Sequence, residues 1–207
     1  MVWGKFIADF NTLGDEVKKY QIIYADPPWH FGSGCVYQDG GRPVRKIEDQ
    51  YLTTKTKDLK QIPVQDICDK DCLLFMWVID SHIPDALELI KAWGFKYSTV
   101  AFYWVKKYNT GSNCYNVGRW TMKTVEPVFL ASMGTPMHFK KKSNVKQLIE
   151  AVRTKHSKKP NEVKDRIVEL CGDLPRIELF ARQKTEGWDV WGNEVESDID
   201  LTGGSHD

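Results

Sequence analysis

The amino-acid sequence predicts an α/β fold in which a mostly parallel sheet carries helices on both faces. Short apolar runs, typical of buried strands, alternate along the chain with segments that have the apolar spacing of helices. Strands separated by helices form βαβ units, whose connections cover a parallel sheet on both sides. The chain has 207 residues, of which 42% are hydrophobic, and this length fits one domain with a sizeable core.

Five segments are predicted to be strands, because each is a compact run of apolar, aromatic or β-branched residues. In chain order they are residues 21–25, 72–79, 97–105, 125–132 and 176–181. In open sheets of this class, ligands bind at the carboxyl ends of the strands. The residues that follow each strand are therefore the first to inspect for function.

Two segments are predicted to be helices. The first covers residues 81–93, with Ser81 as its N-terminal cap and Gly94 as its stop. The second covers residues 162–170, and it is opened by a proline and closed by Gly172.

The remaining chain divides into loops and a tail. We expect residues 1–196 to form a single domain and residues 197–207 to be a disordered acidic tail. Loops as long as those between the predicted elements usually serve function or are disordered. Three stretches have this character: 31–50, 106–124 and 134–143.

Composition excludes several classes of protein. The five cysteines form no C-x-x-C pair, so neither a disulfide framework nor a zinc site is indicated, and we expect no metal. No signal peptide or apolar run of membrane-spanning length occurs, which favours a cytoplasmic protein without membrane contact. The net charge is only +1, but local basic clusters such as Lys140 to Lys142 are candidate phosphate contacts.

The tetrapeptide Asp26-Pro27-Pro28-Trp29 directly follows the first predicted strand. Asp and Pro are common in turns, and a simple turn is the plain interpretation. Three features favour a catalytic role: the place at a strand end, two prolines that fix the backbone and remove two N–H donors, and the flat apolar face of Trp29 beside an acid.

This set of groups suits methylation of an aromatic amine. The N6 amine of adenine is a poor nucleophile, because its lone pair is delocalised into the ring. The Asp26 carboxylate and the Pro27 carbonyl, in a segment expected to hold no competing backbone donor, could accept the two N–H bonds and orient the nitrogen. Trp29 could stack on the base. An adenine in a duplex would have to flip out of the stack to reach these groups.

Residues 24–29 (YADPPW) resemble the signature of the MT-A family of adenine N6-methyltransferases, which are related to the seventy-kilodalton catalytic subunit of mRNA adenosine methyltransferase and include phage and bacterial members. Four further segments resemble later signatures of the family in the same order: 74–78, 157–162, 177–182 and 187–193. The resemblance implies a Rossmann-like class I fold that uses S-adenosylmethionine, in a bacterial host cell.

The resemblance also implies roles for individual residues. Cofactor binding falls to Asp26 and to a set spread along the chain: Asp9, Phe10, Lys159, Phe180, Arg182, Lys184, Asn193 and Glu194. Contacts to the acceptor base fall to Tyr51, Trp77 and Glu126. Two of these also follow from the residues themselves: Arg182 is polar at a strand end, and Glu126 in an apolar strand would be costly to bury unpaired.

The resemblance leaves the substrate and the assembly open. The leading hypothesis is methylation of DNA, because a compact chain without a long extension is typical of phage and bacterial members. The same chemistry would serve RNA. A non-catalytic nucleic-acid-binding partner subunit is a third hypothesis, and the intact Asp26 argues against it. A homodimer and a complex with a partner subunit are both compatible with the sequence.

Overall fold

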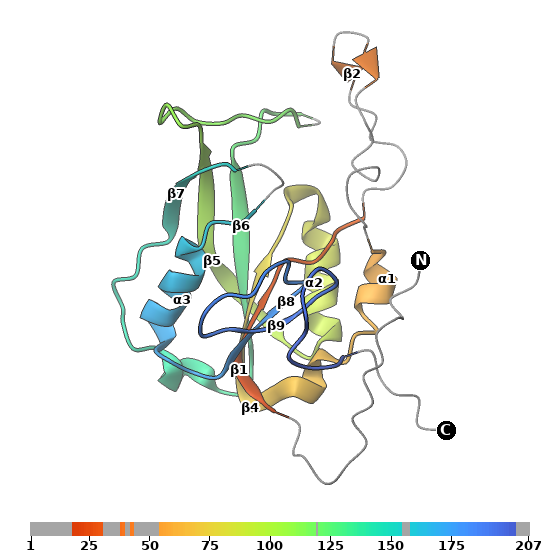
Figure 1. Cartoon of the computed structure of the whole chain (residues 1–207), viewed down its shortest axis with the longest axis vertical. Helices are drawn as coiled ribbons and strands as arrows, with labels where there is room; N and C mark the ends of the chain where they lie inside the picture. Colours follow the sequence, from red (N-terminus) through yellow and green to blue (C-terminus); the bar gives the residue numbers. More distant parts are fainter. Residues whose placement is uncertain are drawn as a thin grey trace.

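The computed structural model describes residues 18–30, 38–39, 42–43, 54–118, 120–154 and 158–201. A sheet of seven strands, in the order β7-β5-β6-β4-β1-β8-β9, forms the centre of the molecule (Figure 1). Its members are β1 (Tyr20–Ala25), β4 (Cys68–Trp77), β5 (Lys96–Lys107), β6 (Val125–Met133), β7 (Leu148–Val152), β8 (Arg176–Leu179) and β9 (Asp189–Trp191). Two short strands form a separate antiparallel pair, β2 (Gln38–Asp39) and β3 (Arg42–Pro43).

The helices are few and short. They comprise α1 (Thr56–Leu59), α2 (Ile83–Ala92) and α3 (Glu162–Cys171), with 3-10 turns η2 (Val64–Ile67), η3 (Asp80–His82) and η4 (Pro136–Phe139). None of the helices in the described ranges is long and apolar enough to cross a membrane.

The sheet is mostly parallel, as predicted. Strand β6 runs antiparallel to both of its neighbours, β4 and β5, and every other neighbouring pair is parallel. Because β6 points the other way, it begins at Val125 on the same edge of the sheet where the other six strands end. We call this the catalytic edge, after the catalytic role predicted for Asp26, which follows β1 there.

The two faces of the sheet carry separate hydrophobic cores. Successive side chains of a strand point to opposite faces. Ile22 and Tyr24 therefore pack with α3, and Ile23 and Ala25 pack with α2. Figure 1 shows α2 and α3 on opposite sides of the strands, which confirms the prediction of helices on both faces.

All five predicted strands are present, with ends that differ by a few residues. Two strands of the sheet, β7 and β9, were not predicted, and neither was the separate pair of β2 and β3. Strands β7 and β9 are short and are the two outermost strands of the sheet. In β7, exposed positions alternate with less exposed ones instead of forming an apolar run. Edge strands need less apolar character because one side of their backbone has no neighbour.

The predicted helices are also present, with one correction at an end. Helix α3 ends at Gly172, whose φ of 83° is readily adopted by glycine alone. Ser81 does not cap α2: its hydroxyl pairs with Nδ1 of His82, and the helix begins only at Ile83 after the η3 turn. The prediction of a Ser81 cap is therefore wrong.

The predicted tail also needs correction at its start. The Asp198 carboxylate accepts the Val190 N–H at 2.9 Å, and Leu201 is buried in the core on the α2 face. Residues 197–201 thus pack against the end of β9, and the prediction of disorder is wrong for them. The acidic composition suggested a solvated tail, because it does not show that Asp198 accepts a backbone hydrogen bond or that Leu201 is buried.

Candidate active site

Asp26 leaves the sheet at the end of β1 in a tight turn. The Trp29 N–H donates to the Pro27 carbonyl at 2.9 Å, and the Thr54 N–H donates to the Pro28 carbonyl at 2.8 Å. The expectation that no backbone donor competes for the Pro27 carbonyl is therefore wrong. A carbonyl oxygen has two lone pairs, so this one retains the capacity to accept a second N–H.

The Asp26 carboxylate is paired with Lys159. The Lys159 Nζ lies 2.7 Å from Asp26 Oδ2, and the lysine comes from the segment just before α3. The Asp26 side chain is 34% exposed and the Lys159 side chain is 15% exposed. The Asp26 carboxylate is therefore partly exposed to solvent, while the Lys159 ammonium group that pairs with it is mostly buried.

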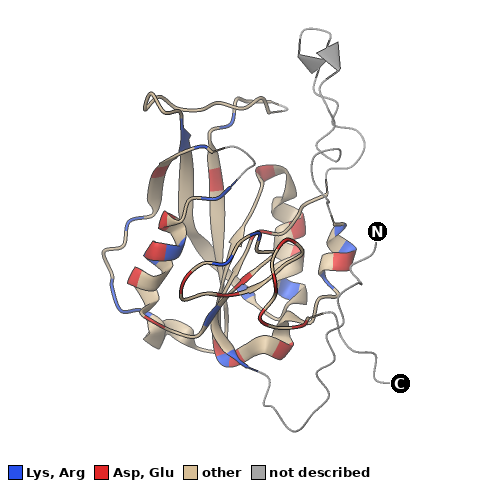
Figure 2. Cartoon of the chain, in the orientation of Figure 1, with Lys and Arg blue, Asp and Glu red and all other residues tan. Residues whose placement is uncertain are grey.

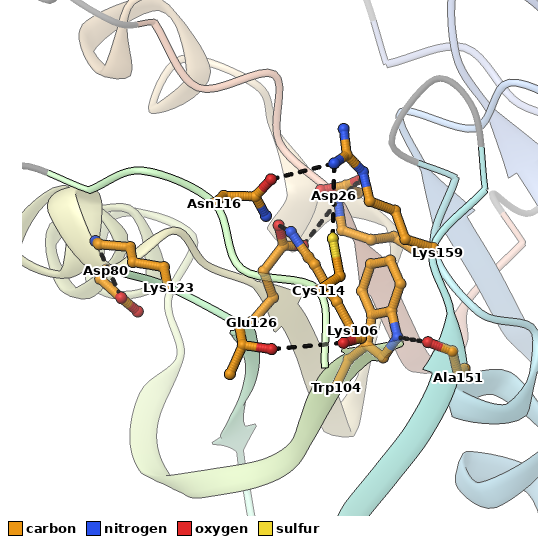
Figure 3. Close-up of polar contacts among 12 residues, drawn as sticks. Asp26, Asp80, Trp104, Lys106, Cys114, Asn116, Lys123, Glu126, Ala151 and Lys159 are labelled. Atoms are coloured by element: carbon orange, nitrogen blue, oxygen red, sulfur yellow. Dashed lines mark hydrogen bonds and ion pairs between the residues drawn. The ribbon is translucent and has the colours of Figure 1, made fainter. Parts of the chain in front are cut away.

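The ion pair continues into a chain of four alternating charges (Figure 3). Lys159 Nζ also lies 3.7 Å from Glu126 Oε2, and the other oxygen of Glu126 accepts from Lys106. We call Asp26, Lys159, Glu126 and Lys106 the charge chain. With two carboxylates and two ammonium groups it carries no net charge, so burial of its inner members is compensated.

Two tryptophan rings support the lysines of this chain. The Lys159 Nζ lies 5.3 Å from the Trp77 ring centroid, and the Lys106 Nζ lies 5.2 Å from that of Trp104. The rings themselves meet edge to face, at 6.2 Å and 78°. Cation–π contacts of this kind favour the charged form of a lysine at a position sheltered from water.

The ionisation of the inner pair follows from these contacts. Burial alone lowers the pKa of Lys159, but the charges of Asp26 and Glu126 outweigh it and raise that pKa above its ordinary value. Burial likewise raises the pKa of Glu126, but Lys159 and Lys106 hold it below its ordinary value. Both groups are thus charged at neutral pH, in agreement with a polar role for Glu126.

Trp29 and Trp77 are core residues in this structure. The Trp77 indole N–H donates to the Tyr24 hydroxyl at 2.6 Å. Trp29 is only 3% exposed, its N–H donates to the Trp77 carbonyl, and its ring packs against that of His82. This burial contradicts the prediction that Trp29 offers an open face for stacking on a base; the contacts assign it to holding the Asp26 turn in place.

The residues that follow β8 and β9 form a second part of the catalytic edge, next to Asp26. Leu179 pairs with Ala25, so Phe180 follows β8 where Asp26 follows β1. Phe180 has a φ of 62°, a rare conformation for a bulky residue, and its ring contacts those of Trp93 and Trp191.

Arg182 follows β8 and Glu194 follows β9, and the backbones of these two turns lie close together. Arg182 Nε lies 3.6 Å from Glu194 Oε1, and Asn193 is in the same turn as Glu194. A Cβ atom on Gly192 would lie 2.1 Å from the Ala181 carbonyl oxygen, so only glycine fits between the two turns. Lys184 differs from this group, because it pairs with Asp198 at 3.0 Å.

Two functional candidates were missed at the level of sequence. Lys106 is one. It lies near the end of a long amphipathic strand, and no feature of the sequence distinguishes it from an ordinary exposed lysine. The other is a buried pair in which Lys164 donates to Glu178 and, at 2.7 Å, to the Thr185 hydroxyl. Glu178 lies in an apolar strand just as Glu126 does, so the argument from the cost of burial would have found it.

Several predicted site residues are not brought to this edge or cannot be placed. Asp9, Phe10 and Tyr51 lie outside the described residues. The Lys140–142 run lies at the opposite edge of the sheet: the Lys141 N–H donates to Leu170 at the end of α3, and Lys142 pairs with Glu169. The run is therefore distant from Asp26, and its contact with phosphates stays a prediction. Within the described ranges, no group of three His, Cys, Asp or Glu side chains could hold a metal ion.

Comparison with known proteins identifies relatives over most of the chain. The MT-A70 family model matches residues 20–194. The chain is 38% identical over 189 residues to the Type II methyltransferase M.MunI of Mycoplasma sp, an alignment that covers 86% of this chain and 78% of the relative.

Eukaryotic relatives match at lower identity and over a smaller share of their own length. The N(6)-adenine-specific methyltransferase METTL4 of Homo sapiens is 27% identical, over 86% of this chain and 38% of its own. The N6-methyladenosine RNA methyltransferase MTA1 of Pyricularia oryzae is 24% identical, over 89% and 49%.

Proposed function

We propose, since the chain belongs to the MT-A70 family, that it transfers a methyl group from S-adenosylmethionine to the N6 amine of adenine in DNA. The observation that carries the proposal is the position of Asp26. It follows β1 within the family's Asp-Pro-Pro-Trp motif, and it is held as a partly exposed carboxylate by Lys159 at the catalytic edge.

Asp26 and Pro27 act on the acceptor amine. One carboxylate oxygen of Asp26 is engaged by Lys159, and the other is left to accept an N–H of the amine. The remaining lone pair of the Pro27 carbonyl accepts the second N–H. These two bonds draw the nitrogen lone pair out of the ring and direct it toward the methyl donor.

Proton transfer comes last in this scheme. The nitrogen uses its lone pair to form the N–CH₃ bond as the S–CH₃ bond breaks and sulfur keeps the electron pair. The amine becomes acidic only once it is methylated, and Asp26 then takes the proton. Lys159 holds the Asp26 carboxylate in place for that step, because its Nζ lies 2.7 Å from Oδ2.

The described residues fit an S-adenosylmethionine site beside Asp26. When bound, S-adenosylmethionine supplies a methyl group on a positively charged sulfur. Lys159 is a cation suited to the methionine carboxylate, and Arg182, Asn193 and Glu194 supply polar groups for ribose hydroxyls. The unusual backbone of Phe180 is of the kind that is retained where a loop shapes a binding site.

DNA is favoured over RNA by the degree of similarity to the relatives. This chain is 38% identical to the type II methyltransferase, type II being the designation of a class of DNA-modifying enzymes, and 24% identical to the fungal RNA methyltransferase. The chemistry at the base would be the same on RNA, so RNA is the second candidate. The Mycoplasma relative supports a place in the cytoplasm of a bacterial cell.

The test is transfer of labelled methyl from S-adenosylmethionine to matched DNA and RNA, each single- and double-stranded. We expect incorporation into DNA, with N6-methyladenine as the product by mass spectrometry. Incorporation into RNA alone would show that the substrate is RNA and not DNA. Incorporation into neither, by protein that binds S-adenosylmethionine, would favour a non-catalytic partner subunit.

A further inference from the structure

A hairpin with an exposed tryptophan projects from the catalytic edge. It connects β5 to β6, and Figure 1 shows it extending beyond the strands. Trp120 is 90% exposed, which is rare for the largest apolar side chain. Other exposed side chains of the same hairpin are also large and apolar: Tyr108, Tyr115, Val117 and Met122. An exposed apolar group of this size marks a surface that contacts something else.

The charge of this region complements an anionic partner. Outside the charge chain, residues 107–124 include two lysines and one arginine and no acidic residue, and residues 151–158 include three Lys or Arg residues and no acidic one. Figure 2 shows basic positions at the end of β5 and between β7 and α3. Lys107 and Lys123 pair with the half-exposed Glu150 and Asp80, weak ion pairs that phosphates can replace.

Hydrogen bonds join the two sides of the hairpin on either side of its tip and connect its base to the charge chain. Asn116 and Lys123 exchange backbone hydrogen bonds of 2.7 and 2.8 Å, and the Arg153 guanidinium donates to the Asn116 side chain at 3.1 Å. At its base, the Lys106 N–H donates to the Thr124 carbonyl. Trp120 is six residues from Glu126, so it lies no further than roughly 22 Å from that residue.

We propose that this hairpin enters duplex DNA and that Trp120 fills the gap in the base stack when the target adenine turns toward Asp26. The inference rests on the proposed function, since it names how that site obtains its substrate. The N6 amine is paired in a duplex, so the base must leave the stack to reach a carboxylate at the sheet edge. A flat indole that stacks on the neighbouring bases offsets part of the cost of that step.

The experiment compares Trp120→Ala with a matched control, Met137→Ala. Met137 is 79% exposed and lies in η4, at the opposite edge of the sheet. The methylated adenine is first located by sequencing DNA treated with the unmodified protein. Two duplexes are then made around it, one with thymine opposite the adenine and one with an abasic site there, which leaves the adenine unpaired.

We expect Trp120→Ala to slow methylation of the fully paired duplex by about tenfold or more, and methylation of the abasic duplex by less than about threefold. Trp120→Phe should recover most of the rate, and Met137→Ala should match the unmodified protein on both duplexes. With 2-aminopurine in place of the target adenine, fluorescence should rise on binding the unmodified protein and not on binding Trp120→Ala.

Other outcomes would overturn the inference. Equal loss on both duplexes, or no loss on either, would show that Trp120 does not act on base pairing. A change from dimer to monomer in Trp120→Ala by sedimentation would assign the tryptophan to a protein contact instead. The proposed function fails separately and earlier: if the unmodified protein methylates no adenine in the DNA that is sequenced, no target is located.

Discussion

The Nζ atom of Lys159 lies 2.7 Å from Oδ2 of Asp26, although 133 positions separate the two residues. The same Nζ lies 3.7 Å from a carboxylate oxygen of Glu126. One ammonium group therefore serves two carboxylates, one exposed at the catalytic edge and one sheltered behind it. Removal of any member changes the charge that the others experience, and the charge chain can be tested one residue at a time.

Asp26→Ala should lower the rate of methyl transfer by about 10²-fold or more, because the amine loses an acceptor that acts on it directly. Affinity for S-adenosylmethionine should stay within a few-fold, since Lys159 keeps Glu126 as a partner and the fold is retained. Single-turnover kinetics and calorimetry measure the two quantities. Asp173→Ala, which removes an exposed acid at the opposite edge, is the control. Near-normal turnover of Asp26→Ala would refute the mechanism.

Lys106→Met should destabilise the fold by about 1–3 kcal/mol, because it leaves Glu126 in a sheltered position with one cation instead of two. Lys107→Met is a matched control from the next position: its partner Glu150 is half-exposed, so the loss should be under about 1 kcal/mol. Urea unfolding measures both. Combining Lys106→Met with Glu126→Gln should recover stability, and a double variant as unstable as the sum of the single variants would contradict this coupling.

Glu126→Gln should remove part of the acid sensitivity of the protein. Lys159 and Lys106 hold the pKa of Glu126 below its ordinary value, and a carboxyl shifted in this direction stabilises the fold above its unfolded pKa. That contribution is lost as the pH falls through the lower, folded pKa. The stability difference between the unmodified protein and the variant should therefore be largest near neutral pH and shrink below about pH 4. A difference independent of pH between about 3 and 7 would mean that folding does not lower the pKa of Glu126.

The sequence could predict the strands of the sheet and the place of Asp26 at a strand end, because apolar runs and the Asp-Pro-Pro turn are local signals. Lys159 and Glu126 were named as well, but for separate tasks, one on the cofactor and one on the base. That they share a single ammonium group depends on the order of strands in the sheet, which no local pattern encodes.

Lys106 shows most directly why part of the site could not be predicted. Trp104 lies opposite Glu126 in the β5–β6 pair, so Lys106 is a diagonal neighbour of Glu126 on the same face. This contact exists only because β6 is antiparallel and in this register. Trp29 shows the converse: its chemistry suggested stacking on a base, and the packing of His82 against it could not be foreseen from spacing.

Gly192→Ala should impair cofactor binding without touching any residue assigned to the cofactor. A methyl group at position 192 would lie 2.1 Å from the Ala181 carbonyl oxygen, so the turns that hold Arg182 and Glu194 must separate. We expect a loss of S-adenosylmethionine affinity of about tenfold or more, read by calorimetry, since displacement of ordered polar contacts costs at least about 1–2 kcal/mol. Gly111→Ala is the control, because Gly111 has a positive φ but open space around it, so its strain should lower stability and leave cofactor affinity unchanged. Equal affinities of the two variants would show that the close approach of the β8 and β9 turns does not form the cofactor site.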